Sequence, residues 1–190
     1  MDLCWHIVTD VPRSRRDLRL LSGLLLRWAV LATLPIACAS QSPLSAPLFR
    51  QAEARNFIFS TPDGVPFSTA DIRGRPSVLV FVTTYDPISQ VVVERLKVVA
   101  RTRHPRINVA VVVLEPPQNA VLAATYADAL ELPFPVVLAD PATLHGGGPF
   151  GEIRQVPTFV VLDSEGREVY RGVGGEAIAR LEAPLDQLQH

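Results

Sequence analysis

Hydrophobic residues are spaced in two different patterns along this chain, one of which predicts strands and the other a helix. Two nearly continuous, β-branched runs, SVLVFVTT at 77–84 and INVAVVVLE at 107–115, are typical of strands buried on both faces. Between them apolar residues recur at helical spacing, which predicts a helix over about 87–101. The apolar positions of this expected helix are Ile88, Val92, Leu96 and Val99.

Shorter patterns precede this unit. NFIFS at 56–60 predicts a strand, and VPFS at 65–68 pairs back on it as a hairpin because the intervening PDG is a typical turn. TADIRG at 69–74 predicts a short helical turn, with Thr69 as its N-terminal cap and Gly74 as its stop.

The second half of the chain predicts further alternation and a late hairpin. We expect a helix at 120–132, a strand at 135–140, a glycine-rich loop at 145–155, paired strands at 158–163 and 167–172, and a closing helix at 176–188 interrupted by Pro184. Early alternation followed by a hairpin predicts a mixed sheet with helices on both faces.

The N-terminal residues differ in character from the rest. Residues 1–39 have a basic start and an apolar run too short to span a bilayer, which predicts an export leader. SRRDLRL at 14–20 resembles a twin-arginine signal, although a basic flank of any leader explains it as well. Residues 40–54 are small, polar and proline-marked, which favours a linker or tether before a domain at 55–187.

The end of the leader has three interpretations. Ala37-Cys38-Ala39 forms an A-x-A cleavage site that would release a protein beginning at Ser40. PIAC at 35–38 resembles a bacterial lipobox, which would acylate Cys38 and tether the chain to a membrane. An uncleaved signal anchor is the third. All three place the domain outside the cytoplasm, in the periplasm or facing it.

Charge and thiol content narrow the function. From Ser40 onward the chain has 13 basic and 16 acidic residues, a net charge of −3, which gives no reason to expect nucleic acid as a partner. The cysteines are Cys4 and Cys38, both in the predicted leader. The predicted domain therefore has no thiol.

The order of elements, together with several short motifs, resembles the thioredoxin fold and, more narrowly, its TlpA-type and redoxin branch, which includes peroxiredoxin relatives. The resemblance rests on DGVPFSTADIRGRPSVLVFVTTYDPIS, on ELPFPVVLAD and on VPTFVVLDSEGR, and it covers about 55–185. It implies an α/β three-layer fold, with a central mixed β-sheet flanked by helices and an N-terminal β-hairpin. It also implies that Val156-Pro157-Thr158 is the family's cis-proline loop, facing the redox motif.

The same alignment shows what is missing. Tyr85 stands where the family usually has tryptophan, Asp86 stands at the nucleophilic cysteine, and Ser89 stands at the resolving cysteine. Thiol–disulfide exchange and peroxide reduction both need a thiolate, which these oxygen-bearing side chains cannot supply. We therefore expect this domain not to be a redox enzyme, and we expect no cofactor and no metal.

Asp86 has an ordinary structural role open to it. Aspartate is a favoured N-cap, and Pro87 suits the first helical position, so we expect Asp86 to cap the helix that follows. Hydrolase chemistry at Ser89 would need a nearby base. His104 lies at the far end of that helix, His145 is in the glycine-rich loop and His190 ends the chain, so we expect none.

Three functional hypotheses follow. The first is a non-catalytic module of the cell envelope that binds an extended polypeptide or another protein partner. Its expected contacts are Tyr85, Asp86, Ser89, Val156, Pro157 and Thr158, with strand addition at the backbone of Val156. The second is a TlpA-type oxidoreductase or redoxin that uses a thiol from elsewhere. The third is a structural envelope domain with no groove function.

Overall fold

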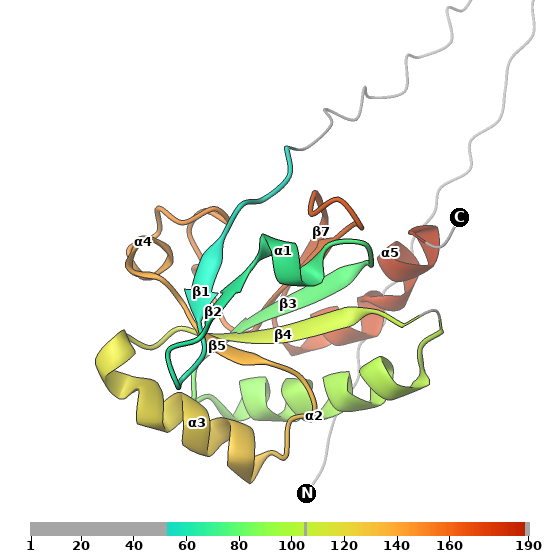
Figure 1. The fold of residues 1–190 in the computed structure, drawn as a ribbon. Helices are drawn as coiled ribbons and strands as arrows, with labels where there is room; N and C mark the ends of the chain where they lie inside the picture. Colours follow the sequence, from blue (N-terminus) through green and yellow to red (C-terminus); the bar gives the residue numbers. More distant parts are fainter. Residues whose placement is uncertain (1–52, 105, 189–190) are drawn as a thin grey trace, which may run out of the picture. The chain divides into compact units, whose positions relative to one another are not determined.

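A computed structural model describes residues 53–104 and 106–188 of the chain. The predicted leader at 1–39, most of the linker at 40–54, Cys38 and His190 lie outside the described residues. A single sheet of seven strands organises the described part, in the order β2-β1-β5-β4-β3-β6-β7 (Figure 1). The strands are β1 (Ile58–Ser60), β2 (Pro66–Ser68), β3 (Ser77–Val82), β4 (Asn108–Val113), β5 (Val136–Leu138), β6 (Thr158–Leu162) and β7 (Glu168–Val173).

Strand direction follows from the connections. β3, β4 and β5 pair in parallel because helices link them, whereas β1 with β2, β1 with β5, β3 with β6, and β6 with β7 pair antiparallel. The helices are α1 (Thr69–Ile72), α2 (Pro87–Thr102), α3 (Ala120–Ala129), α4 (Pro141–Leu144) and α5 (Glu182–Gln187), with 3₁₀ turns η1 (Pro117–Asn119) and η2 (Gly175–Arg180). The expected mixed sheet and N-terminal hairpin are confirmed.

Both faces of the sheet are buried, which explains the unbroken apolar runs. In β3, Val78, Val80 and Val82 pack with α2, α3 and α5. Leu79 and Phe81 point the other way, into a second core with Phe57, Phe59 and Phe150. Figure 1 shows α2 and α3 together on one side of the sheet, with α1 and α4 on the other. Consecutive residues of the central strands are therefore mostly apolar, with Ser77 and Thr158 as buried polar exceptions, because side chains alternate between two cores.

Two local expectations need correction. Thr69 is the first residue of α1, and its cap is Ser68, whose hydroxyl accepts from the Ala70 N–H. Thr69 is instead buried, where its Oγ1 accepts a hydrogen bond from the Phe57 N–H at 2.9 Å. The closing helix breaks before Glu182 and not at Pro184, which lies in the first turn of α5, where a missing N–H costs nothing.

The glycine-rich loop also has a feature that the sequence analysis missed. α4 precedes it, capped by Asp140, whose Oδ1 accepts from the Thr143 N–H at 3.0 Å.

Gly74 ends α1 as expected, with a φ of +86° that favours glycine. Among residues 53–104 and 106–188, no helix has the length and apolar character needed to cross a membrane.

Candidate functional site

The start of α2 carries Asp86 and Ser89, the residues that the sequence resemblance aligned with two cysteines. Asp86 is the N-cap, and its carboxylate accepts hydrogen bonds from the Ile88 N–H at 3.3 Å and the Ser89 N–H at 2.8 Å. Pro87 is the first helical residue, where its missing N–H leaves nothing unpaired. The predicted capping role of Asp86 is confirmed.

Ser89 is bound to the same carboxylate. Its hydroxyl donates to Asp86 Oδ2 at 2.6 Å, and the residue has no exposed surface. The side chains of Asp86 and Ser89, the two residues that the resemblance aligned with cysteines, are therefore bonded to each other. A partner contact at Ser89 stays a prediction, and in this structure its side chain has no exposed surface through which to make one.

These bonds fix the protonation state of Asp86. The Ser89 hydroxyl is the largest influence and lowers the pKa of the Asp86 carboxyl below 3.8, helped by the Ser89 and Ile88 N–H groups against a smaller effect of burial. At neutral pH the carboxylate is ionised and points its lone pairs at the helix end. It is thus a structural anion and a poor general acid.

The exposed part of this region is apolar. Tyr85 is 78% exposed, and Ile88 and Val91 are each 54% exposed. Ile88 and Val91 border an open groove of about 670 Å³ between α2 and η2, which Gly175 and Ala179 line on the opposite side. Ile88 and Val91 therefore give this groove an apolar wall on the α2 side, and the charged side chains of Arg95, Glu176 and Arg180 also line it.

This groove corrects the predicted apolar stripe of α2. Ile88 is exposed, and the buried positions are Ser89, Val92, Val93 and Leu96, which follow the helical spacing i, i+3, i+4, i+7. This buried set was not predicted from the sequence because it places a serine, Ser89, among the core residues. The signal was present in the spacing, and the small size of serine is compatible with a close packing position.

The Val156-Pro157-Thr158 loop lies at the same end of the sheet. β6 pairs with β3 so that Thr158 lies opposite Phe81, which places this loop near the end of β3 that leads to Asp86. The Val156–Pro157 peptide bond is cis, as the resemblance implied. Pro157 and Thr158 are buried and Val156 is half-buried, so Val156 alone of the three has an exposed surface for a partner.

A set of buried polar groups lies beneath these residues and was not predicted. Glu115 follows β4 and accepts from the Thr84 hydroxyl at 3.3 Å and from Asn119 Nδ2 at 3.0 Å. The hydroxyls of Thr83 and Tyr126 are buried without a hydrogen-bond partner among the described residues. Burial, reinforced by the charges of Asp86 and Glu94, raises the pKa of Tyr126 to about 12. These hydroxyls are therefore neutral at physiological pH.

The Ser89 hydroxyl is buried and donates to Asp86, so a substrate cannot reach it as a nucleophile in this structure. His104 lies beyond the C-terminal end of α2, at the opposite end of that helix from Asp86. His145 follows the last residue of α4, and its Nδ1 lies 2.6 Å from the carbonyl oxygen of Pro141, the first residue of that helix. Within the described ranges, no group of three metal-ligating side chains gathers.

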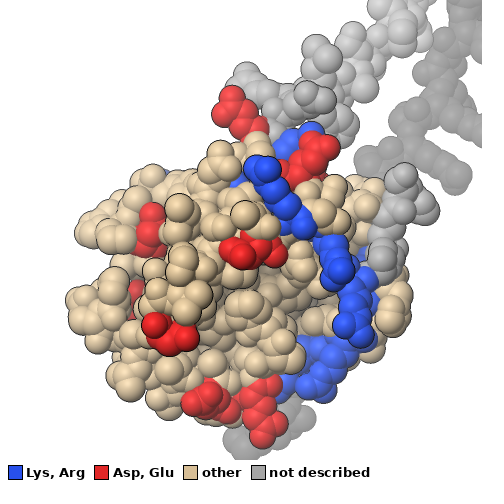
Figure 2. All heavy atoms as spheres, viewed as in Figure 1, with Lys and Arg blue, Asp and Glu red and all other residues tan. Residues whose placement is uncertain are grey.

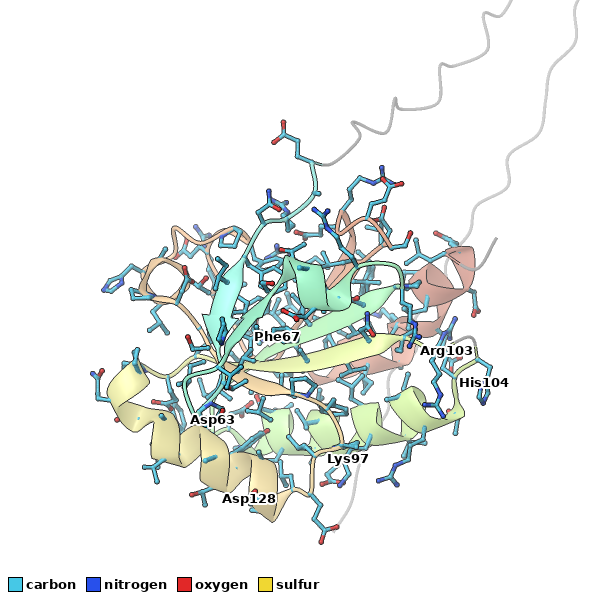
Figure 3. The ribbon with its side chains drawn as sticks, viewed as in Figure 1. Asp63, Phe67, Lys97, Arg103, His104 and Asp128 are labelled. Carbon is cyan, nitrogen blue, oxygen red and sulfur yellow. The ribbon has the colours of Figure 1, made fainter. Side chains whose placement is uncertain are left out.

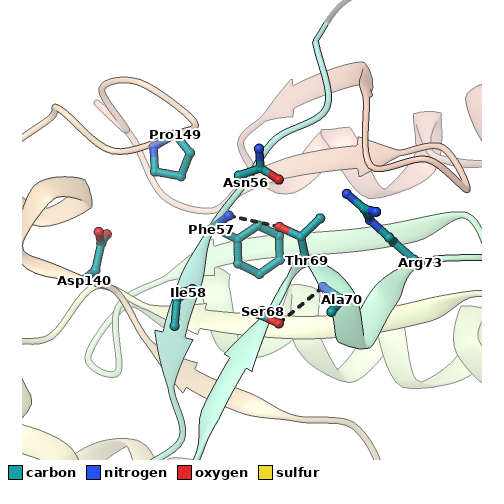
Figure 4. Close-up of a pocket in the computed structure, with 9 residues that line it drawn as sticks. All are labelled: Asn56, Phe57, Ile58, Ser68, Thr69, Ala70, Arg73, Asp140 and Pro149. Atoms are coloured by element: carbon teal, nitrogen blue, oxygen red, sulfur yellow. Dashed lines mark hydrogen bonds between the residues drawn. The ribbon is translucent and has the colours of Figure 1, made fainter.

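A separate hollow lies on the other face of the sheet. It measures about 610 Å³, and Figure 4 shows Asp140 and Pro149 on one side of it and Arg73 on the other. Most of its polar groups are already engaged within the chain, since Thr69 bonds to Phe57 and Asp140 caps α4. We therefore do not assign a ligand to it.

Comparison with known proteins gives relatives by structure only. The sequence matches no protein-family model and no curated protein. Its structure is similar to a secreted Mycobacterium tuberculosis disulfide oxidoreductase homologous to E. coli DsbE (19% identity, TM-score 0.55, 70% of this chain and 96% of that one). It is also similar to a thioredoxin-family thiol:disulfide interchange protein from Chlorobium tepidum (23% identity, TM-score 0.55, 74% and 98%) and to StoA from Bacillus subtilis (21% identity, TM-score 0.52, 70% and 98%).

These structures share the arrangement described above, and their identities to this chain are low enough that the likeness concerns the fold and not the activity. The described part of this chain has a thioredoxin-like fold, the fold of these thiol–disulfide oxidoreductases.

Proposed function

We propose that this protein is a non-catalytic binding module of the cell envelope, which holds a polypeptide or protein partner at the former redox end of a thioredoxin-like domain. The observation that carries the proposal is the bond between Asp86 and Ser89. The oxygens at both former cysteine positions are committed to capping α2 and to each other, so they are not free to react.

The inventory of thiols supports the absence of redox chemistry. Cys4 and Cys38 are the chain's cysteines, and neither falls within residues 53–188. A mixed disulfide needs a sulfur on each partner, and an aspartate or serine cannot provide one. The alternative function, a TlpA-type oxidoreductase or a redoxin, would need a thiol from outside the domain.

The surface around this end supports binding. Tyr85, Ile88 and Val91 expose apolar side chains where a capped helix begins, and contiguous exposed apolar surface marks interaction sites on soluble domains. The half-buried Val156 precedes β6, which pairs with β3, and we expect its backbone to receive an extended segment of the partner. In this proposal Tyr85, Ile88 and Val156 contact the partner, while Asp86 and Ser89 hold the helix that presents them.

The envelope location is part of the proposal. It rests on the predicted leader and on the secreted oxidoreductase among the structural neighbours. A tether through Cys38 would keep the module at a membrane, whereas cleavage at Ala39 would release it.

The test is photo-crosslinking in the cells that make the protein. A photoreactive amino acid replaces Tyr85, and the matched control replaces Val121 of α3, which is also apolar and 69% exposed. We expect a discrete adduct from position 85 and none from position 121. Adding Ile88→Arg, an exposed substitution that should leave unfolding unchanged, should remove the adduct. Equal labelling from both positions, or none from either, would contradict binding at this end.

A second assay separates the alternative. The full chain carrying Cys4→Ser and Cys38→Ser is tested for disulfide reduction and peroxide turnover. We expect no rate above background. A rate that persists without these two cysteines would overturn the inventory of reactive groups on which the proposal depends.

A further inference from the structure

The sheet has a second distinctive end, opposite the one discussed above. Four exposed arginines gather where β3 and β4 begin, and we call this surface the basic edge: Arg73, Arg75, Arg101 and Arg106. Arg73 ends α1, and Arg101 lies in the last turn of α2. Figure 2 shows basic side chains following one another down this side of the molecule. Figure 3 shows Arg103 and His104 at the same end of α2.

Strand pairing places two of these arginines at the same edge of the sheet. Ser77 of β3 lies beside Asn108 of β4 in parallel register, and the Asn108 N–H donates to the Pro76 carbonyl at 2.9 Å. Arg75 comes shortly before β3 and Arg106 shortly before β4, so both lie where this pairing begins. Like charges on one edge repel each other, so a counter-charge at this place is favourable.

The described residues do not supply that counter-charge. Arg73, Arg75, Arg101 and Arg106 form no ion pair within residues 53–104 and 106–188. The nearby acids are engaged elsewhere, in bonds that involve Asp71 with Ser68, Asp186 with Arg103, and Asp163 and Glu165 with Arg167. The basic edge is therefore an uncompensated cationic surface.

The chain enters the domain beside this edge. Ala54 forms a bridge with Arg167, and the Arg55 N–H donates to the Gly166 carbonyl at 2.8 Å. The same turn contacts the α1–β3 connection, because the Gly74 N–H donates to the Ser164 carbonyl at 2.9 Å. The polypeptide that leads back to the apolar N-terminal run thus leaves the domain next to Arg73 and Arg75.

We propose that the basic edge docks the domain on a membrane surface rich in anionic phospholipid. Guanidinium groups pair with phosphate through two parallel hydrogen bonds, and basic residues next to a membrane anchor are attracted to anionic lipid. β3 and β4 run away from the basic edge toward Thr83 and Glu115. Docking therefore turns the Asp86 end of the domain away from the lipid.

Two facts favour lipid over a polyanion in solution. The chain from Ser40 onward has a net charge of −3, which does not attract free nucleic acid from a distance. The predicted N-terminal leader, if it stays at a membrane, would keep the basic edge at a high local concentration of headgroups. At moderate salt charges act over roughly 10 Å, so this closeness is needed for attraction. The proposal does not depend on the function of the Asp86 end.

The test measures how close each end of the domain lies to lipid. The full chain, with Cys4→Ser and Cys38→Ser, is synthesised in the presence of vesicles of phosphatidylcholine alone or with 30% phosphatidylglycerol, a share chosen as roughly that of an anionic leaflet. A fluorophore is attached at Thr102→Cys on the basic edge or at Gln118→Cys beyond the other end of β4. Quenching by a headgroup-labelled lipid then reports proximity.

We expect quenching at position 102, with anionic vesicles only, and none at position 118. The triple variant Arg73→Gln, Arg75→Gln, Arg106→Gln should lower the docking equilibrium about a hundredfold, because each arginine near an anionic membrane contributes roughly a fivefold factor. The matched control is Arg95→Gln, Arg154→Gln, Arg180→Gln, which removes the same charge elsewhere and should leave quenching unchanged. Thermal unfolding of both triples shows whether each remains folded.

Three results would overturn the proposal. They are absent quenching at position 102, equal quenching on both kinds of vesicle, and equal loss in the two triple variants. A further assay mixes the unlabelled parent chain with a DNA duplex at 150 mM salt, where exposed charges are screened beyond roughly 8 Å. If the chain bound the duplex and was thereby displaced from anionic vesicles, the basic edge would be assigned to nucleic acid instead.

Discussion

The starts of α1 and α2 use the same two residue types in opposite order. In α1 the cap is Ser68 and the aspartate comes three residues later, at Asp71; in α2 the cap is Asp86 and the serine comes three residues later, at Ser89. The bonds are alike, since the backbone N–H of each serine donates to the aspartate, at 2.7 Å in α1 and 2.8 Å in α2. In both places the pKa of the aspartate lies below 3.8.

The difference is in the surroundings. The Ser68–Asp71 pair lies at the surface, at the start of a helix of four residues. Ser89 belongs to the first turn of a helix of sixteen residues and is wholly buried. The comparison teaches that an aspartate–serine capping pair with the same local bond can start either a short surface helix or a long one packed on the core. The requirement that remains is local: a small, polar side chain must fit at position 89 and bond to the cap.

The largest effect should come from restoring cysteines. In a chain with Cys4→Ser and Cys38→Ser, the pair Asp86→Cys, Ser89→Cys recreates a C-P-I-C motif at the start of a long helix, which lowers a thiol's pKa. We expect disulfide reduction to rise from background by about tenfold or more, because the thiolate fraction at neutral pH is only a few per cent for an ordinary cysteine. An insulin reduction assay measures it.

The matched control places the same spacing at the other helix. Ser68→Cys, Asp71→Cys gives two cysteines three residues apart at the start of α1, which is too short to supply a comparable helix field. We expect little or no gain in rate there. Equal rates from the two double variants would mean that the end of the sheet near Asp86 no longer favours this chemistry.

The next effect is on stability. Asp86→Ala should lower the free energy of unfolding by about 2 kcal/mol, roughly half from the lost cap and half from the buried Ser89 hydroxyl left without an acceptor. Asp71→Ala should cost about 0.5 kcal/mol, since its bonds lie at the surface. Urea unfolding of both variants decides the matter, and equal losses would show that burial of Ser89 adds nothing.

The smallest effect is a pH dependence. Because the folded pKa of Asp86 is depressed, its ionised form contributes stability that is present above 3.8 and is lost as the pH falls through the folded pKa. The stability advantage of the native chain over Asp86→Asn should therefore shrink below about pH 4, by less than about 1 kcal/mol. Asp71→Asn should behave with the same sign. Thermal melts between pH 2.5 and pH 6 measure the change, chosen to bracket the ordinary carboxyl pKa of about 3.9. An advantage that grows on acidification would contradict the depressed pKa.

The sequence by itself determined the sheet and its main helix. Unbroken β-branched runs at β3 and β4 can be stable only between two cores, and the turn glycines and prolines mark where the chain reverses. The capping role of Asp86 was also predictable, because an N-cap bond joins neighbouring residues and needs no tertiary contact. The absence of cysteine from residues 53–188 could also be read directly from the sequence.

Tertiary structure decided which side chains of α2 face the core. The spacing of Ile88, Val92 and Leu96 was compatible with a buried stripe, yet in the folded domain Ser89 is buried and Ile88 lines the groove beside η2. Tertiary structure also brought Arg75 and Arg106 to the same edge of the sheet, since only the pairing of β3 with β4 joins these distant positions. Local bonds can be predicted from a short stretch of sequence, whereas exposure and charge pairing depend on which distant elements pack together.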